Sequence, residues 1–237
     1  MASNDKSSDG TLKVLSAGAV KRGVAKIAQE FERETGTRVT VEFAPVPEVR
    51  KRVAAGESAD VLVATPAAMD EFAAHGKIAP DSRGFVGRSR MGVVVHTSAT
   101  KPDLSNTDAF KKVMLGASAV VYNRASSGLY AAKLLEKLGL VKPLGRRVVV
   151  VDTGAAIMEY VAGHPTAAVG LAQISEVMVM IDQGCAVKLA APLPDAIQNI
   201  TAYDAAAAAG APDAAGALAM RFASDAAKPV FAATGIS

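Results

Sequence analysis

The chain has 237 residues, half of them hydrophobic, which is enough for a sizeable core and excludes a disordered chain. The formal net charge of +3 and the absence of a basic run with interleaved aromatic residues give no argument for a nucleic-acid partner, but they suit a small anionic ligand. A single cysteine, Cys185, excludes an internal disulfide and a cysteine-rich metal site, and His75, His96 and His164 have no metal-ligand spacing. We therefore expect no metal and no cofactor.

The first part of the chain alternates short apolar segments with amphipathic ones. Residues Val24, Ile27 and Phe31 recur at helical spacing, and Gly36 is a natural helix stop. The pattern predicts strands at 12–16, 37–44 and 59–65, and helices at 21–36, 45–56 and 66–76. This alternation is typical of a parallel sheet with helices on both faces.

The same alternation continues after residue 90. A loop with Ser105 or Asn106 as a plausible N-cap precedes a helix, and another helix is expected from Ser127. Strands are predicted at 90–99, 117–123, 146–154, 167–175 and 185–194, with a helix at 155–164. The alanine-rich residues 204–235 are predicted to be helical.

The extended segment with Pro192 and Pro194 indicates a chain that crosses back from a second lobe to the first. We expect an α/β fold in which lobe 1 comprises 11–92 and 200–237, lobe 2 comprises 93–195, and residues 1–10 form a disordered tail. Each lobe would be a mostly parallel sheet flanked by helices. A ligand cleft would lie between the lobes, where the carboxyl ends of the strands point.

The first residues are polar, with no apolar core and no cleavage pattern, so we do not expect them to be a signal peptide. No apolar run approaches the roughly 18–20 residues that a membrane span needs. Two alternatives follow: a periplasmic protein whose signal has been removed, or a cytoplasmic protein. We expect a monomer in either case.

Several strand-to-helix turns are rich in small residues and would offer free amide donors and the positive end of a helix dipole. They are "SAGAVKRG" (16–23), "APVPEV" (44–49), "NRASSG" (123–128) and "VDTGAA" (151–156). One such turn is common in any α/β protein. Four turns that converge on one cleft would form a site for an oxyanion or a carboxylate.

The third turn carries Arg124, whose planar guanidinium matches a carboxylate in a two-point contact. The alternative is that Arg124 lies on the surface. Ser126 and Ser127 could contact a ligand or cap the following helix, and Thr153 has the same two alternatives.

Other catalytic motifs are absent: the first turn lacks the Lys-Ser ending of a phosphate loop, and there is no G-x-S-x-G elbow. Asp60 is expected to bond to nearby backbone rather than to a ligand. Weak candidates for proton transfer, each also explicable as a surface or packing residue, are Glu48, Tyr122, Asp152, Glu176 and Tyr203.

The order of the stretches "LKVLSAGAVKRGVAKIAQEFERETGTRV", "ADVLVAT", "SSGLYAAKLLEKLG" and "AAVGLAQISEV" resembles the periplasmic molybdate-binding protein family, from about residue 12 to the end. These are type 2 solute-binding proteins of ABC transporters. The resemblance implies two α/β lobes joined by hinge strands, an anion held between them by serine hydroxyls and backbone amides, and an ABC-transporter permease as a partner.

The resemblance also places ligand contacts on particular residues. The serine of the family's first turn falls at Ala19, its serine-rich second turn falls at Val46 and Pro47, and its tyrosine falls at or near Gln173. Two hydroxyl-bearing turns are thus lost, which favours an organic carboxylate over molybdate. The predicted ligand-binding residues are Ala17, Gly18, Ala19, Val46, Pro47, Arg124, Ser126, Ser127, Thr153 and Gln173.

Aconitate isomerase, a branch similar to molybdate-binding proteins, supplies a second hypothesis. Such an enzyme moves a double bond in an unsaturated tricarboxylate without a cofactor, with positive groups stabilising the charge that develops. We rank solute binding first and isomerisation second. A cytoplasmic ligand sensor ranks third, because no helix-turn-helix precedes residue 12.

Overall fold

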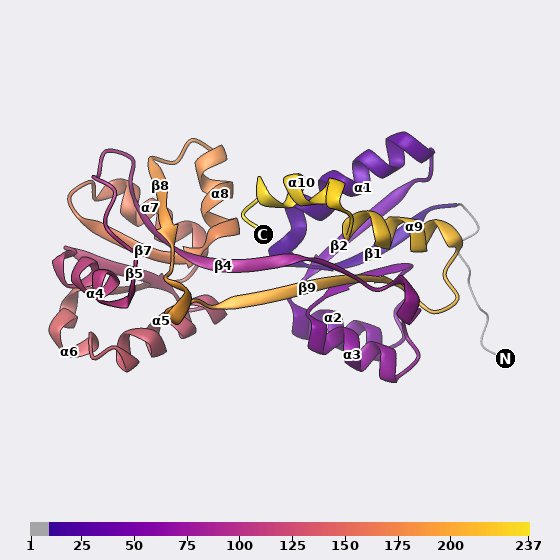
Figure 1. Ribbon diagram of the computed structural model, residues 1–237, viewed down its shortest axis with the longest axis horizontal. Helices are drawn as coiled ribbons and strands as arrows, with labels where there is room; N and C mark the ends of the chain where they lie inside the picture. Colours follow the sequence, from indigo (N-terminus) through magenta and orange to yellow (C-terminus); the bar gives the residue numbers. More distant parts are fainter. Residues whose placement is uncertain (1–9) are drawn as a thin grey trace. The chain divides into compact units, whose positions relative to one another are not determined.

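The computed structural model describes residues 10–237 and shows a mixed α/β fold (Figure 1). The chain folds into two compact units: unit 1 contains the residues up to Arg88 and Thr201–Ser237, and unit 2 contains Ser89–Ile200. The tail predicted at residues 1–10 lies outside the described residues, apart from Gly10.

Unit 1 has the strand order β2-β1-β3-β9, with the first three strands parallel and β9 antiparallel to β3. The strands are β1 (Leu12–Ala17), β2 (Val39–Ala44), β3 (Val61–Ala64) and β9 (Ile200–Ala207). The helices are η1 (Gly18–Val20), α1 (Lys21–Thr35), α2 (Val46–Ala54), α3 (Pro66–Ala74), η2 (Pro80–Ser82), α9 (Asp213–Phe222), η5 (Asp225–Ala227) and α10 (Lys228–Ala232).

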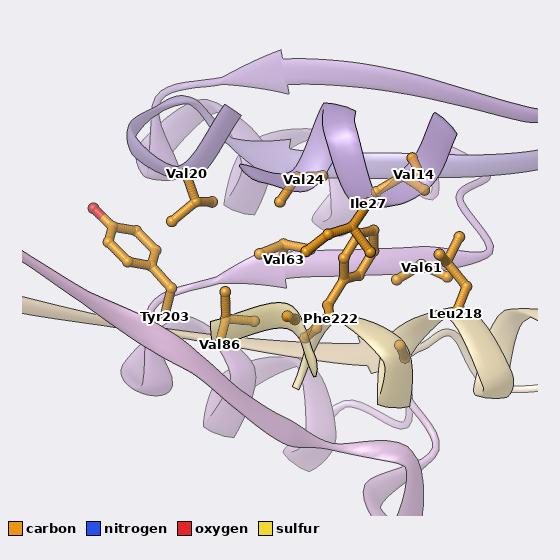
Figure 2. Close-up of a cluster of buried hydrophobic side chains, with 14 of the residues drawn as sticks. Val14, Val20, Val24, Ile27, Val61, Val63, Val86, Tyr203, Leu218 and Phe222 are labelled. Atoms are coloured by element: carbon orange, nitrogen blue, oxygen red, sulfur yellow. The ribbon is translucent and has the colours of Figure 1, made fainter. Parts of the chain in front are cut away.

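Both faces of the unit 1 sheet are covered because its strand residues are apolar on both sides. Val14 joins a buried cluster with α1 and α9, whereas the next residue, Leu15, joins a second cluster with α2 and α3. Figure 2 shows the first cluster, in which Val24 and Ile27 of α1 face Phe222 of α9. The helical spacing predicted for α1 is therefore confirmed.

Unit 2 has the strand order β4-β7-β5-β6, and β8 also pairs with β4. Strands β5, β6 and β7 are parallel, whereas β4 is antiparallel to both β7 and β8. The strands are β4 (Gly84–His96, which begins in unit 1 and enters unit 2 at Ser89), β5 (Ala119–Asn123), β6 (Val148–Val151), β7 (Ala168–Gln173) and β8 (Val187–Pro192). The helices are α4 (Thr107–Gly116), α5 (Ser126–Lys137), α6 (Val141–Leu144), η3 (Gly145–Arg147), α7 (Gly154–Gly163), α8 (Ile174–Asp182) and η4 (Asp195–Ile197).

The unit 2 sheet also separates two buried clusters. Val93 packs with Phe110 of α4 and Leu134 of α5, whereas Val94 packs with Met158 of α7 and Val177 of α8. Helices on both faces of each sheet confirm the predicted fold class.

Three local predictions differ from the structure. Strand β4 begins at Gly84 rather than at residue 90, and the helix Ile174–Asp182 was not predicted at all. Residues 204–207, expected to be helical, end strand β9, where they pair with Val61–Ala64 and are buried. Alanine has no strong preference for a strand, so tertiary pairing overrides its helix propensity here.

Asn106, rather than Ser105, caps α4. Its Oδ1 accepts hydrogen bonds from the amides of Asp108 and Ala109, at 3.0 and 2.9 Å. Within residues 10–237, no helix is both long and apolar enough to cross a membrane.

Candidate functional site

The carboxyl ends of β1, β2 and β3 form one edge of unit 1, which we call edge 1. Their register places Ala17 beside Ala44, and η1, α2 and α3 begin directly after the three strands. Edge 1 therefore contains the predicted residues Ala17, Gly18, Ala19, Val46 and Pro47. Ala17 is buried, and the other four are half-buried or exposed. No side chain among these five can donate a hydrogen bond, so of these residues only Ala17, Gly18, Ala19 and Val46 could serve an anion, through their backbone amides.

Strand β9 brings Tyr203 to edge 1. Asp204 pairs with Ala64, the last residue of β3, so Tyr203 lies one residue past the end of that strand. Figure 2 shows its ring beside Val20, with the hydroxyl pointing away from the buried cluster. Burial raises the pKa of Tyr203, which therefore stays a neutral hydroxyl donor at pH 7.

Arg83 links the start of α3 to β9 at edge 1. Its Nε donates to Oδ2 of Asp204 at 2.8 Å and its Nη1 donates to Oδ1 of Asp70 at 2.6 Å. Its Nη2 donates to the Pro66 carbonyl oxygen at 3.3 Å. The negative charge of buried Asp204 is thus compensated within unit 1. Sequence reasoning missed this group because 121 residues separate Arg83 from Asp204.

The carboxyl ends of β5, β6 and β7 form one edge of unit 2, which we call edge 2. Asn123 pairs with Val151 at the ends of β5 and β6, and α5, α7 and α8 start beyond the three strands. Edge 2 gathers the predicted residues Arg124, Ser126, Ser127, Thr153 and Gln173. The proton-transfer candidates Asp152 and Glu176 lie at the same edge, whereas Glu48 lies in α2 of unit 1.

The N-cap position of α5 is Ala125, and the side chain of Asn123 accepts amides at the helix start, which corrects the prediction that Ser126 could be the cap. Its Oδ1 accepts from the amides of Ala125 and Gly128, both at 3.1 Å, and from the Ser127 hydroxyl at 3.4 Å. A Cβ at position 128 would overlap the carbonyl oxygen of Asn123, so the turn requires glycine there. Ser127 is buried, whereas Ser126 is exposed at the start of the helix.

Arg124 lies beside the next turn of edge 2. Its amide donates to the Val151 carbonyl oxygen at 3.0 Å, and its Nε donates to Oδ1 of Asp152 at 2.9 Å. The two side chains are 69% and 85% exposed, so solvent screens this ion pair strongly. Arg124 therefore lies at edge 2, and its side chain is also exposed on the surface.

Thr153 caps α7, because its Oγ1 accepts from the Ala156 amide at 3.1 Å. Gly154, the first residue of α7, lies close to the carboxylate of Glu176 from the first turn of α8. A Cβ at position 154 would overlap that carboxylate, so the close approach requires glycine. A carboxylate at a helix N-terminus is electrostatically favoured.

Gln173 ends β7 at edge 2, and Ser89 fixes its side chain. The Ser89 hydroxyl donates to Oε1 of Gln173 at 2.6 Å, which leaves the amide nitrogen as a donor. Met91 pairs with Gln173, so Arg90 lies one residue past the end of β7. The Nε of Arg90 is buried and makes no hydrogen bond within residues 10–237. Sequence reasoning missed Arg90, because only the strand register places it at this edge.

The remaining candidates have structural contacts. Oδ2 of Asp60 accepts from the Lys13 amide at 2.7 Å, which confirms its predicted backbone role. Tyr122 packs half-buried against the core of unit 2. In the part of the chain that the structure describes, no group of three or more His, Cys, Asp or Glu side chains could hold a metal ion.

Two solved structures with the same fold are described as a substrate-binding domain and a molybdate-binding protein. A substrate-binding domain assigned to a molybdenum ABC transporter of Clostridium difficile superposes with a TM-score of 0.79 at 15% identity, over 96% of this chain and 98% of that one. The periplasmic molybdate-binding protein of Azotobacter vinelandii gives 0.66 at 18% identity, over 95% and 98%. At these identities the likeness establishes the fold, which is that of two-lobed periplasmic binding proteins.

Comparisons of the sequence identify the family to which the chain belongs. An aconitate isomerase from Pseudomonas sp. is 32% identical over 232 residues, which covers 93% of this chain and 85% of that enzyme. The family model described as "Bacterial extracellular solute-binding protein" matches residues 12–237. This match includes every described strand and helix, and the chain therefore belongs to the bacterial extracellular solute-binding protein family.

Proposed function

We propose that this chain binds a small organic anion with several carboxylates at the carboxyl edges of its parallel strands. The observation that carries the proposal is the 32% identity with aconitate isomerase, whose name specifies a tricarboxylate. The molybdate-binding protein shares the fold at only 18% identity, so it does not specify the ligand.

Residue chemistry at the two edges supports a carboxylate over a tetrahedral oxyanion. Edge 1 offers backbone amides among Ala17, Gly18, Ala19 and Val46, without a hydroxyl from these residues. Edge 2 offers a guanidinium, Arg124, beside the start of the twelve-residue helix α5. The planar guanidinium can donate to both acceptor oxygens of a carboxylate, and the helix N-terminus favours its negative charge.

The ion pair of Arg124 with Asp152 leaves the arginine available to a ligand. An exposed pair of this kind contributes about 0–1 kcal/mol, whereas a hydrogen bond between charged groups at a partly desolvated site contributes about 1.5–3 kcal/mol. A ligand carboxylate that approaches Ser126 can therefore replace Asp152 as the acceptor.

A thermal-shift screen tests the proposal. Trans-aconitate, cis-aconitate and citrate should raise the melting temperature, whereas molybdate and sulfate should not. Substitution R124A should weaken binding of the stabilising acid by about 1.5–3 kcal/mol. D152N, which removes the competing acceptor, should not weaken it. Stabilisation by molybdate alone would exclude a carboxylate ligand.

We also propose that, as a binding protein, the chain delivers its ligand to an ABC-transporter permease. The support is the family membership and the description of a structural neighbour as part of an ABC transporter. Co-purification with a permease encoded nearby, in the presence of ligand, would test this partner. Transport that is unaffected by deletion of the gene would contradict it.

Isomerisation is the second candidate, favoured by the same 32% identity. In this reaction a base removes a proton from the CH₂ group beside the double bond, and that electron pair forms the new C=C bond. The carbon at the far end of the old double bond then takes up a proton. Glu176 and Asp152 are carboxylates at edge 2 that could carry the proton, and Arg124 would stabilise the charge that develops on the substrate.

Proton NMR separates binding from isomerisation. Incubation of the protein with cis-aconitate should produce the trans isomer if the chain is an isomerase, and E176Q should slow that conversion more than D152N does. A ligand that stabilises the protein and stays unaltered over a day would exclude this reaction and leave the binding proposal in place.

A further inference from the structure

Arg90 lies at edge 2, and its Nε has no acceptor among the described residues. Its Nε is buried and has no hydrogen-bond partner within residues 10–237. Buried polar groups in proteins are almost always paired, and an unpaired charged donor destabilises the fold. The other arginine of this edge, Arg124, differs because its Nε donates to Asp152.

The strand register fixes the surroundings of Arg90. It follows Ser89 and precedes Met91, the partner of Gln173, so its Cα lies just past the end of β7. Successive residues of a strand point to opposite faces, so Arg90 shares a face with Val94, and Val94 packs with Val177 of α8. Arg90 therefore projects on the face that α7 and α8 cover, at the edge where both helices begin.

The nearby acidic group of these helices is directed elsewhere. The carboxylate of Glu176, in the first turn of α8, lies against Gly154 at the start of α7. Arg90 thus brings a positive charge and an unpaired Nε to the edge where two helices begin, and helix N-termini themselves favour anions.

From this geometry we infer that Arg90 binds a second carboxylate of the ligand, separate from the carboxylate that Arg124 receives. Strands β4 and β5 flank β7, so the two arginines start from strands roughly 10 Å apart, twice the ordinary strand spacing. Long side chains at that separation can both reach a small molecule with two or three carboxylates. The inference rests on the proposed function and narrows the ligand from any organic anion to a polycarboxylate.

The test compares R90M with R146Q by calorimetric titration of trans-aconitate and of its saturated analogue, propane-1,2,3-tricarboxylate. R90M keeps a long apolar side chain but removes the charge. R146Q removes the same charge from an exposed residue of η3, which precedes β6 at the opposite end of the sheet. R90M should weaken both acids by about 10- to 150-fold, the range for a lost charge-assisted hydrogen bond, and R146Q should leave them unchanged. R90K, which keeps the charge without the fork, should lie between wild type and R90M.

A second readout separates ligand binding from a structural role. Because the buried Nε of Arg90 has no acceptor, R90M without ligand should melt at or above the wild-type temperature. A lower melting temperature of ligand-free R90M, with R90K also destabilised, would overturn the inference. Equal affinities of wild type, R90M and R146Q would also overturn it, while the proposed function would stand. Failure of the wild type to bind either acid would overturn both.

Discussion

At the residue scale, Asn123 decides which donors a ligand can use at the start of α5. Its Oδ1 takes the amides of Ala125 and Gly128. The first-turn amides that its side chain does not use belong to Ser126 and Ser127. An anion at this turn therefore meets two amides, an exposed serine hydroxyl and Arg124, a donor set that suits a single carboxylate.

Substitution N123A should lower the free energy of unfolding by about 1–2 kcal/mol, the upper range for a lost N-cap, because Asn123 is buried and caps several donors. S126A is the matched control, since Ser126 is exposed and is not the cap, and it should change stability by less than about 0.5 kcal/mol. Urea denaturation measures both. Equal losses would mean that the serine shares the capping role.

Tyr203 gives unit 1 a pH dependence with a definite sign. Burial raises its folded-state pKa above the unfolded value of about 10, so the folded state favours the neutral phenol. The associated stability is complete below pH of about 10 and is lost as pH rises through the folded-state pKa. Urea denaturation from about pH 9 to about pH 11 should therefore show a smaller loss of stability in Y203F than in wild type. Parallel losses in the two proteins would contradict this.

At the element scale, local patterns predicted most helices and strands, and long-range pairing decided the exceptions. Helix α1 follows from the spacing of Val24, Ile27 and Phe31, and its end at Gly36 has the left-handed φ of 72° expected of a glycine stop. Strand β9 could not be predicted, because its alanines form a strand only through pairing with β3.

For the candidate site, too, local patterns predicted the parts that depend on nearby residues and missed those that depend on long-range pairing. The strand-to-helix turns gave edge 1 and edge 2, because parallel strands end at a common edge. Arg90 and Tyr203 reach these edges on antiparallel strands, from the opposite direction. No local pattern contains that information, so Arg90 was missed and Tyr203 was only a weak candidate.

Two glycine-to-alanine substitutions within helices should have opposite effects. G128A in α5 should destabilise the protein by about 1–3 kcal/mol, because the new Cβ would overlap the backbone of Asn123. G216A in α9 meets open space and should stabilise the protein by about 0.5–1 kcal/mol, because alanine favours the helix interior. Thermal or urea unfolding of both variants measures the contrast. A stabilising G128A would show that the α5 turn is built differently.

At the scale of the whole molecule, fold and ligand chemistry are separable. The two α/β units share their architecture with a molybdate-binding protein, and Ala17, Gly18, Ala19, Val46 and Pro47 at edge 1 carry no side-chain hydroxyl. Arginines at edge 2 supply formal positive charge instead. The proposed function requires that the same scaffold accept a different class of anion through changes at the ends of its strands.

The most direct measurement of the central claim is a calorimetric titration of the wild-type protein with trans-aconitate and, separately, with molybdate, at one pH and ionic strength. We predict saturable binding of the tricarboxylate that weakens as salt concentration rises, and no heat of binding with molybdate. Tight binding of molybdate with no response to the tricarboxylate would contradict it.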